Sequence, residues 1–499
     1  MRAGTLGLGP GPDSTPDARQ AVQRAPRPAV RKAGRISSTA FGKAIEWQGL
    51  PLGLADGTIA CPSRPTHPGR DGEPRGDSLG NSRSGRQTKS LLPPGLALFL
   101  VAMALTESTG AMTSVQIPVY LRWLGADVPQ VGLFFTLSSI VPLVLLVLGG
   151  WLSDSLGRLK AFAIGSVAGV AAFATYAWAR QWGVALIGPA FLAIAMALIR
   201  PSYRAYIADR ARPETRGRVF ALAETAANLT WIFGPPLGGL LAQQLGFPWL
   251  FLVSCAAYAV AGVLILMMAR TSRSLVDAGQ ERPTLRSLRS SIVQMGAVIL
   301  SGGLVTWLLI TDGIRDIAFR MSFDLMPVYL TDVWGLTRQQ IGLLDGIFGA
   351  VLVLAGYPGG WLCDKTSERL ALVAGLLAVI ASRLAFILVS GFWGFAFSWS
   401  LLAIGVALMD PAIQSLIAIG VPARLRGIAY GLLATSWGLF SLPSPWIGGL
   451  LWDRLGPQAP FLATVAIGLL ALVPAWFKLR TPPETAEPES PPGRAQASS

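Results

Sequence analysis

Between Gly95 and Lys478 the sequence consists of twelve apolar segments separated by polar loops, and the loop after the sixth segment is the longest. Each segment is close to the roughly 20 residues that a helix needs to cross about 30 Å of hydrocarbon. Backbone groups in the bilayer core find no water, so each segment is expected to be a helix. The expected spans are 95-121, 128-151, 159-180, 183-207, 217-243, 247-269, 301-330, 338-362, 369-390, 392-416, 427-452 and 459-478. The sequence therefore predicts an all-α membrane protein with 12 transmembrane helices.

A short polar motif occurs twice, 210 residues apart. Gly-Gly-Trp-Leu-Ser-Asp at 149–154 recurs as Gly-Gly-Trp-Leu-Cys-Asp at 359–364, again between two apolar segments. The same offset superposes Gln130, Gly132, Pro201, Pro235, Gly238 and Gly239 on Gln340, Gly342, Pro411, Pro445, Gly448 and Gly449. A match at a fixed period indicates an internal duplication. The helices are therefore expected to form two pseudo-symmetric six-helix halves.

Composition divides the chain into five parts. Only 14% of the residues are charged, far from the roughly 25% of a soluble domain. We expect a disordered basic tail at 1-90, an N-terminal half at 91-269, a cytoplasmic linker at 270-300, a C-terminal half at 301-480 and a disordered tail at 481-499. A basic tail without apolar periodicity is more typical of a disordered, membrane-proximal segment than of a nucleic-acid-binding one. No nucleic-acid partner is expected.

The distribution of Lys and Arg predicts the orientation. Loops after helices 2, 4, 6, 8 and 10 hold fifteen of these residues, and the other loops hold only Arg122, Arg180, Arg338 and Arg454. Positive residues accumulate on the cytoplasmic side of membrane proteins. Both termini and the linker are therefore expected in the cytoplasm, and the membrane is expected to be a bacterial inner membrane.

Several classes of function are disfavoured. The only histidine, His67, lies in the tail, and Cys61, Cys255 and Cys363 have no metal or redox spacing. There is no glycine-rich phosphate loop and no nucleophile motif. An enzyme is therefore not expected, nor a cofactor or a metal site, and carboxylates must carry any proton chemistry.

Motifs in the loops and in helix 5 resemble those of a known family. Gly150, Asp154, Gly157, Arg158 and Lys160 match the signature between helices 2 and 3 of the major facilitator superfamily of secondary transporters. The second copy keeps Gly360 and Asp364, but Ser367 and Glu368 replace its Gly-Arg pair and Arg369 follows. The segment 234–239, Gly-Pro-Pro-Leu-Gly-Gly, is similar to the helix 5 signature of antiporters, with Thr230 in place of an earlier glycine. The buried helix 4 arginine of drug-proton antiporters is missing near Gly188 and Pro189. The resemblance covers residues 95 to 480 and implies the fold and transport, but no subfamily.

These motifs have a physical interpretation. Asp154 near Arg158 suits an ion-pair latch at the cytoplasmic side, with Asp364 and Arg369 as its second copy, and the alternative is a loop charge that only enforces topology. Glycine lets two helices approach closely in lipid. The glycines expected at helix contacts are Gly234, Gly238, Gly239, Gly448 and Gly449.

Ionisable residues inside predicted spans are candidates for function because their burial in lipid is costly. Helix 7 carries Asp312, Asp316, Arg320 and Asp324 at steps of four, with Arg315 three residues after Asp312. Such a stripe is expected to line a cavity or to form a self-neutralising ladder. Asp345 lies in helix 8 and Arg383 in helix 9. Arg200 and Asp410 are repeat equivalents, each before a proline, and they are candidates either for pairing across the halves or for reaching water.

Glu107 and Asp316 occupy matching places in the two halves. Pro-Val-Tyr-Leu at 118–121 matches 327–330 at an offset of 209, which places Asp316 opposite Glu107, each eleven residues before its proline. Eleven helical residues span roughly 16 Å, about half of the hydrocarbon thickness. We therefore expect the two carboxylates to face one cavity and to form a proton-exchange site. The alternative is that an arginine neutralises Asp316 while a cage of hydroxyls surrounds Glu107.

We therefore expect a monomeric secondary transporter that works by alternating access, with a small-molecule substrate, protons and the lipid bilayer as partners. Efflux of an amphipathic or cationic compound by proton antiport is the leading hypothesis. Uptake of a sugar or organic anion is the alternative, with Arg315, Arg320 and Arg383 as anion clamps. A membrane sensor on a transporter fold is the alternative of another class.

Overall fold

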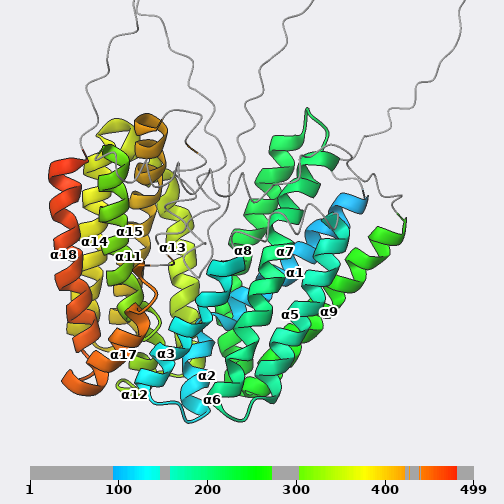
Figure 1. Cartoon of the computed structure of the whole chain (residues 1–499), viewed down its shortest axis with the longest axis horizontal. Helices are drawn as coiled ribbons and strands as arrows, with labels where there is room; N and C mark the ends of the chain where they lie inside the picture. Colours follow the sequence, from blue (N-terminus) through cyan, green and yellow to red (C-terminus); the bar gives the residue numbers. More distant parts are fainter. Residues whose placement is uncertain are drawn as a thin grey trace, which may run out of the picture. The chain divides into compact units, whose positions relative to one another are not determined.

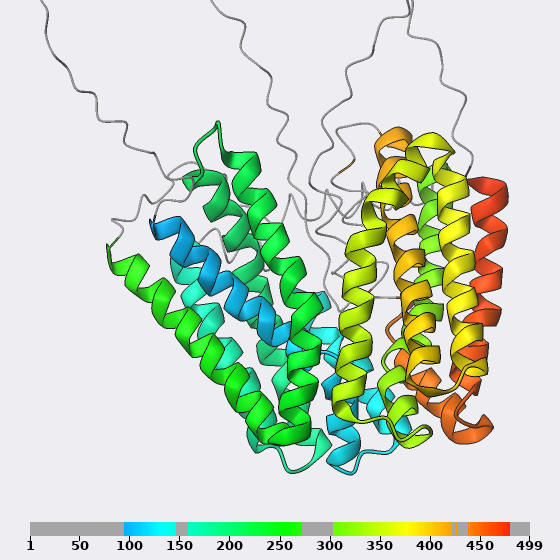
Figure 2. The same ribbon diagram turned by 180° about the vertical axis from the view of Figure 1, so that it is seen from behind.

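The computed structural model describes residues 94–145, 158–271, 303–421, 426, 438 and 440–479. Within these ranges the regular structure is helical and contains no strand (Figures 1 and 2). The predicted tails, most of the linker, and Gly150, Asp154 and Gly157 of the loop motif lie outside the described residues.

Eight helices form the described part of the first half. They are α1 (Pro94–Thr113), α2 (Gln116–Trp123), α3 (Val128–Ser138), α5 (Arg158–Trp178), α6 (Trp182–Ala185), α7 (Ile187–Arg210), α8 (Arg216–Gln244) and α9 (Phe247–Thr271). α5 packs against both α7 and α9, while α1 packs against α8 and α9. The apolar interior of this half includes the buried rings of Phe99, Phe162, Tyr176 and Phe251.

Seven helices form the described part of the second half. They are α11 (Leu304–Phe323), α12 (Met326–Asp332), α13 (Arg338–Lys365), α14 (Glu368–Leu388), α15 (Gly391–Gly420), α17 (Ser444–Leu455) and α18 (Ala459–Lys478). α14 packs against α15 and α18, and α11 packs against α18.

Four predicted helices are interrupted where each was expected to be continuous. The helical hydrogen-bond pattern is interrupted between α1 and α2, between α11 and α12, between α6 and α7, and at Ser139 after α3, although the backbone at Val115, Leu325 and Leu186 keeps right-handed helical dihedral angles. Pro118, Pro327, Pro189 and Pro142 follow these interruptions. A proline has no N–H for the carbonyl four residues earlier and its ring clashes with that carbonyl. Those carbonyls belong to Ser114, Phe323, Ala185 and Ser138, at or next to the interruptions.

Nine helical segments among the described residues are long and apolar enough to cross a membrane. The predicted spans 217-243 and 301-330 correspond to α8 and to α11 with α12, but α8 and α11 are not among the nine. α11 carries Asp312, Arg315, Asp316 and Arg320 within 20 residues, which lowers its hydropathy. The predicted span 427-452 lies largely outside the described residues.

Contacts between the halves pair the repeat-related residues reciprocally. α8 packs against α13, and α3 packs against α17. A side chain at Gly342 would overlap the Pro235 carbonyl, and one at Gly132 would overlap the Pro445 carbonyl. Gly132 lies early in α3, and its repeat equivalent Gly342 lies early in α13. Pro235 on α8 and Pro445 on α17 are repeat equivalents as well. Only glycine leaves room there for the opposite backbone.

The glycines expected at helix contacts occupy such close approaches. A Cβ at Gly238 would overlap the Met112 carbonyl oxygen, and one at Gly448 would overlap that of Met321. Gly239 lies against Arg338 of the other half, and Gly449 lies against Pro129 of the other half, with the added Cβ 2.5 and 2.8 Å from their nearest atoms. Gly234 lies against Ala111. The doubled glycines therefore serve two interfaces, one within each half and one between the halves.

Candidate transport site

A cavity of about 300 Å³ lies between the two halves. It is lined by parts of α1, α2, α3, α5, α7, α8 and α9 on one side and of α11, α12, α13 and α15 on the other. The charged residues that line it are Glu107, Arg200, Arg315, Asp316, Arg320, Asp324, Asp345 and Asp410. Its aromatic residues are Phe134, Phe135, Tyr176, Trp231, Tyr258, Phe319, Phe323 and Trp399. The cavity thus combines five carboxylates and three arginines with an extensive aromatic wall.

Glu107 lies on α1 and lines the cavity, as does Asp316 on α11. The predicted cage of hydroxyls around Glu107 is not formed, because those hydroxyls donate to carbonyls of their own helix. Thr106 donates to Met103 O, Ser108 to Ala104 O, Thr109 to Thr106 O, Thr113 to Thr109 O and Ser114 to Ala111 O. Serine and threonine within helices often bond in this way. A second element reaches this region of α1, since the Tyr258 hydroxyl on α9 hydrogen-bonds the Thr109 side chain.

The charged stripe on α11 forms ion pairs along its own helix. Arg315 Nη2 lies 2.5 Å from Asp312 Oδ1, and Arg320 Nε lies 3.3 Å from Asp316 Oδ2. Asp312, Arg315 and Asp316 are almost completely buried. Arg320 also reaches the first half, where its Nη1 lies 3.5 Å from Ser139 Oγ. Asp312 does not line the cavity. The stripe therefore forms ion pairs along its helix, and only part of it faces the cavity.

Two carboxylates on other helices complete the acidic lining. Asp345 on α13 is buried and hydrogen-bonds the Trp399 side chain of α15. Asp410 on α15 and its repeat equivalent Arg200 on α7 both line the cavity, from opposite halves. The two residues that the sequence repeat relates, one from each half, therefore line the same cavity.

The loop-motif residues within the described part lie away from the cavity. Arg158 forms an ion pair with Asp209, and its Nη1 donates to Ala205 O at 3.0 Å. Asp209 lies near the end of α7. In the second half, Arg369 Nη1 donates to Trp476 O at 3.2 Å, and its guanidinium lies 4.6 Å from the centre of the Trp476 ring. Asp364 lies in the last turn of α13 and is exposed.

Sequence reasoning missed the aromatic wall of the site. Aromatic residues occur throughout the apolar segments, and no spacing distinguishes those that face the cavity from those that face lipid. It also left Glu224 without a role, although Glu224 on α8 interacts electrostatically with Arg204 and Glu107. Glu224 lies within the predicted span 217-243, and an ionisable residue inside a span is the signal that could have identified it.

Arg383 lies apart from the cavity and is fully buried on α14. Its Nη1 lies 2.7 Å from the Met326 sulfur, and its guanidinium lies 5.7 Å from the centre of the Phe319 ring. Within the described residues, its Nε and Nη2 have no hydrogen-bond acceptor. The same part of the chain contains no cluster of three or more residues suited to hold a metal ion.

Comparisons with known proteins identify the family. The Major Facilitator Superfamily model matches residues 96–315 and 308–499. Sugar efflux transporter A of Dickeya chrysanthemi is 25% identical over 312 residues, which cover 60% of this chain and 75% of that protein. Quinolone resistance protein NorA of Staphylococcus aureus is 22% identical over 366 residues, covering 72% of this chain and 89% of NorA.

Solved structures agree on the fold. Peptide transporter POT in complex with sulfate matches with a TM-score of 0.62 at 15% identity, covering 78% of this chain and 94% of that one. At this identity the likeness concerns the fold alone. The expectation that the protein is not an enzyme is confirmed by its family and relatives. Because the family model spans the chain from residue 96 onward, this multi-pass membrane protein is a transporter that belongs to the Major Facilitator Superfamily.

Proposed function

We propose that the protein exports a small amphipathic cation across a bacterial inner membrane in exchange for protons, by alternating access of its halves to the central cavity. The observation that supports this proposal is the charge of the cavity lining. Carboxylates outnumber arginines there, and two of the three arginines, Arg315 and Arg320, already form ion pairs with Asp312 and Asp316. The remaining carboxylates suit a cationic ligand better than an anionic one.

The aromatic wall supports the amphipathic part of the proposal. Aromatic faces attract cations and cover apolar surface at the same time. Trp231 and Tyr258 belong to the first half, and Trp399 belongs to the second, so rings stand on both sides of the cavity. A flat aromatic cation would therefore contact both halves together.

Proton exchange would follow from competition at the carboxylates. A proton and a cationic ligand both neutralise Glu107, so binding of one disfavours the other. Glu107 is the better candidate of the repeat-related pair, because Asp316 is engaged by Arg320. The relatives support the direction of transport: one is named a sugar efflux transporter and the other a quinolone resistance protein.

Uptake of a sugar or organic anion is the second candidate. It requires arginines that are available to bind an anion. Arg315 and Arg320 are occupied by aspartates, and Arg383 does not line the cavity. Arg200 is the third arginine of the lining, and it shares the cavity with five carboxylates. We therefore favour export of a cation over this alternative, and transport over a role as a sensor.

The topology is part of the proposal. We infer twelve spanning helices, in halves at 91-269 and 301-480, with the linker and both termini in the cytoplasm. The charge bias of the loops supports this orientation. The working unit is taken to be a monomer, since one chain supplies both halves of the cavity.

Ligand-linked proton release tests the proposal. Tetraphenylphosphonium, an aromatic cation, is added to the purified protein in weak buffer near neutral pH, and the released protons are measured. We expect release in the parent protein and little or none in Glu107→Gln, with binding itself retained. Binding of the cation without proton release in the parent would contradict antiport, and the absence of cation binding alongside binding of an organic anion would favour the second candidate.

A further inference from the structure

Two of the four Lys or Arg residues in the predicted outer loops, Arg122 and Arg338, join one half of the protein to the other. Both belong to the set that departs from the charge distribution of the remaining loops. Their contacts lie at the end of the bundle where α2 packs against α12. Arg122 and Arg338 therefore have a role in joining the halves, which the orientation of the helices in the membrane does not explain.

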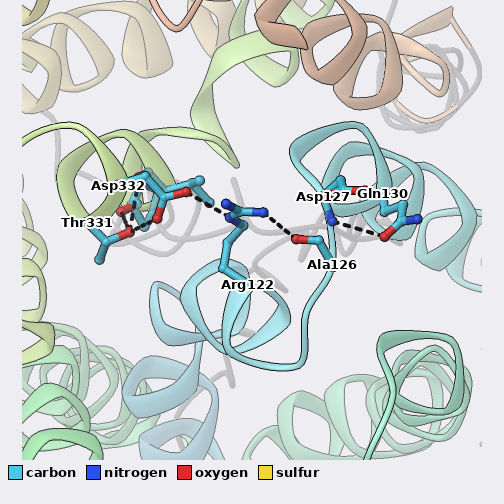
Figure 3. A network of polar contacts seen from close by, with 8 residues as sticks. Arg122, Ala126, Asp127, Gln130, Thr331 and Asp332 are labelled. Atoms are coloured by element: carbon cyan, nitrogen blue, oxygen red, sulfur yellow. Dashed lines mark hydrogen bonds and ion pairs between the residues drawn. The ribbon is translucent and has the colours of Figure 1, made fainter.

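Arg122 connects α2 to α12 (Figure 3). Its Nε lies 2.8 Å from Asp332 Oδ2, and its Nη1 donates to Ala126 O at 2.6 Å. The Thr331 hydroxyl lies 3.1 Å from the other oxygen of Asp332 and is also within hydrogen-bond distance of the Val328 carbonyl. One guanidinium is thus fixed to its own loop and to a carboxylate of the other half at the same time.

Arg338 makes the reverse connection from the second half to the first. Its Nη1 donates to Ala242 O near the end of α8 at 2.8 Å, and its guanidinium lies 4.2 Å from the centre of the Phe247 ring. Its backbone carbonyl accepts a hydrogen bond of 3.1 Å from Gln116 Nε2, and Gln116 is fully buried. Arg338 is therefore held by three residues of the first half.

We propose that Arg122 with Asp332, and Arg338 with Ala242, Phe247 and Gln116, form a pair of reciprocal clasps that keep the outer side of the transporter closed. Every one of these inter-half contacts is lost when the halves separate at this end, whereas contacts within a half are kept. The clasps therefore stabilise the outer-closed state and must break before a substrate leaves to the outside. This inference rests on the proposed alternating access and orientation.

The two clasps differ in expected strength. The side chains of Arg122 and Asp332 are 33% and 28% exposed, and exposed ion pairs contribute little. We expect loss of this pair to shift the ratio of closed to open states by roughly twofold to fivefold. The charged hydrogen bond of Arg338 is part-buried and is joined by a cation–π contact. Its loss is expected to shift the ratio by about tenfold or more.

Accessibility of a cysteine measures this ratio. Ser114→Cys, in a background with Cys61, Cys255 and Cys363 changed to serine, places a thiol in the cavity lining. An impermeant maleimide is applied to intact cells and, separately, to inside-out vesicles. We expect Arg338→Gln to increase labelling of intact cells by about tenfold, and Arg122→Gln or Asp332→Asn by twofold to fivefold. Arg454→Gln is the matched control, since Arg454 is an exposed arginine of the same side on α17.

A charge exchange distinguishes the ion pair from general damage. Arg122→Asp combined with Asp332→Arg should return labelling to the parent rate. Unchanged labelling in correctly folded Arg338→Gln and Arg122→Gln would overturn the clasps. If Arg338→Gln fails to fold, the part-exposed Arg122 and Asp332 variants decide the question. Increased labelling from inside-out vesicles alone would refute the outer position, and a parent that labels as expected but moves no cation would refute the proposed function and leave the clasps standing.

Discussion

Gly342 on α13 offers a substitution whose effect is confined to one conformational state. A Cβ at this position would overlap the Pro235 carbonyl oxygen and lie 2.9 Å from the carbonyl carbon. Comfortable contacts between such atoms begin near 3.5 Å, so Gly342→Ala requires α13 and α8 to move apart by several tenths of an ångström or more. The two helices belong to different halves, and they separate in any state that is open at this end.

The expected magnitude follows from the cost of overpacking. Inserting a methyl group into a tight contact costs about 1–3 kcal/mol. If the cost falls on the outer-closed state alone, the open state gains roughly 5-fold to 150-fold in relative population. The intrinsic preference of a helix for alanine over glycine acts in both states and does not alter this ratio.

Spin labels measure the predicted shift. Cysteines at Trp123 and Val333 carry the labels, because both side chains are exposed and belong to different halves. The distance distribution between the labels should move to longer values in Gly342→Ala. Gly360→Ala is the control on the same helix, since a Cβ there meets nothing within 4 Å. A folded Gly342→Ala protein with the distance distribution of the parent would refute the reasoning.

Three further predictions follow from single regions of the chain. Asp154→Asn is expected to slow transport more than it weakens substrate binding, because a latch differs in energy between two states; weaker binding with normal turnover would contradict the latch. Arg383→Met is expected to raise the melting temperature, because it removes a fully buried guanidinium that has only a thioether and a ring face as described neighbours; a fall of several degrees would reveal an acceptor for the charge. Deletion of residues 2–90 is expected to leave membrane insertion and transport unchanged, and loss of transport at normal expression would show that the tail participates.

The sequence repeat relates helix contacts in the two halves, because close packing between helices demands small residues at equivalent positions. Gly132 and Gly342 were identified by offset alone, and the structure places both against prolines that the same offset had related. The positions of Glu107 and Asp316 along their helices followed from the rise per residue. Both carboxylates line the cavity, and their depth in the membrane stays a prediction.

The sequence pattern did not predict the helix interruptions or the partners of the hydroxyl groups near Glu107, because in both cases local backbone hydrogen bonding decides the outcome. The spans 95-121 and 301-330 were expected to be continuous through Pro118 and Pro327, although the missing N–H groups of these prolines interrupt the helical hydrogen bonding before them. The hydroxyls near Glu107 bind their own helix in preference to the carboxylate. Local backbone acceptors are always within reach of such side chains, whereas a carboxylate must be placed there by tertiary packing.

The clasps could not be predicted from the sequence. Arg122 and Asp332 are 210 residues apart and approach only because the halves meet at this end. The charges of Arg122 and Arg338 identified these two residues as exceptions in the loops, but their partners in the other half depend on the relative placement of two bundles. The aromatic residues of the cavity lining could not be predicted either, because the packing of all the other helices decides which side of a helix faces the cavity.

The central claim is proton-driven export from a cavity shared by two halves, and flux in proteoliposomes tests it most directly. Purified protein is reconstituted, a pH gradient is imposed, and movement of tetraphenylphosphonium against the proton flow is recorded with the membrane potential clamped. We predict transport that a protonophore abolishes, and that Glu107→Gln loses while retaining exchange of labelled for unlabelled cation. Transport that persists in Glu107→Gln at the parent rate under the same gradient, or that ignores the gradient in the parent, would contradict the claim.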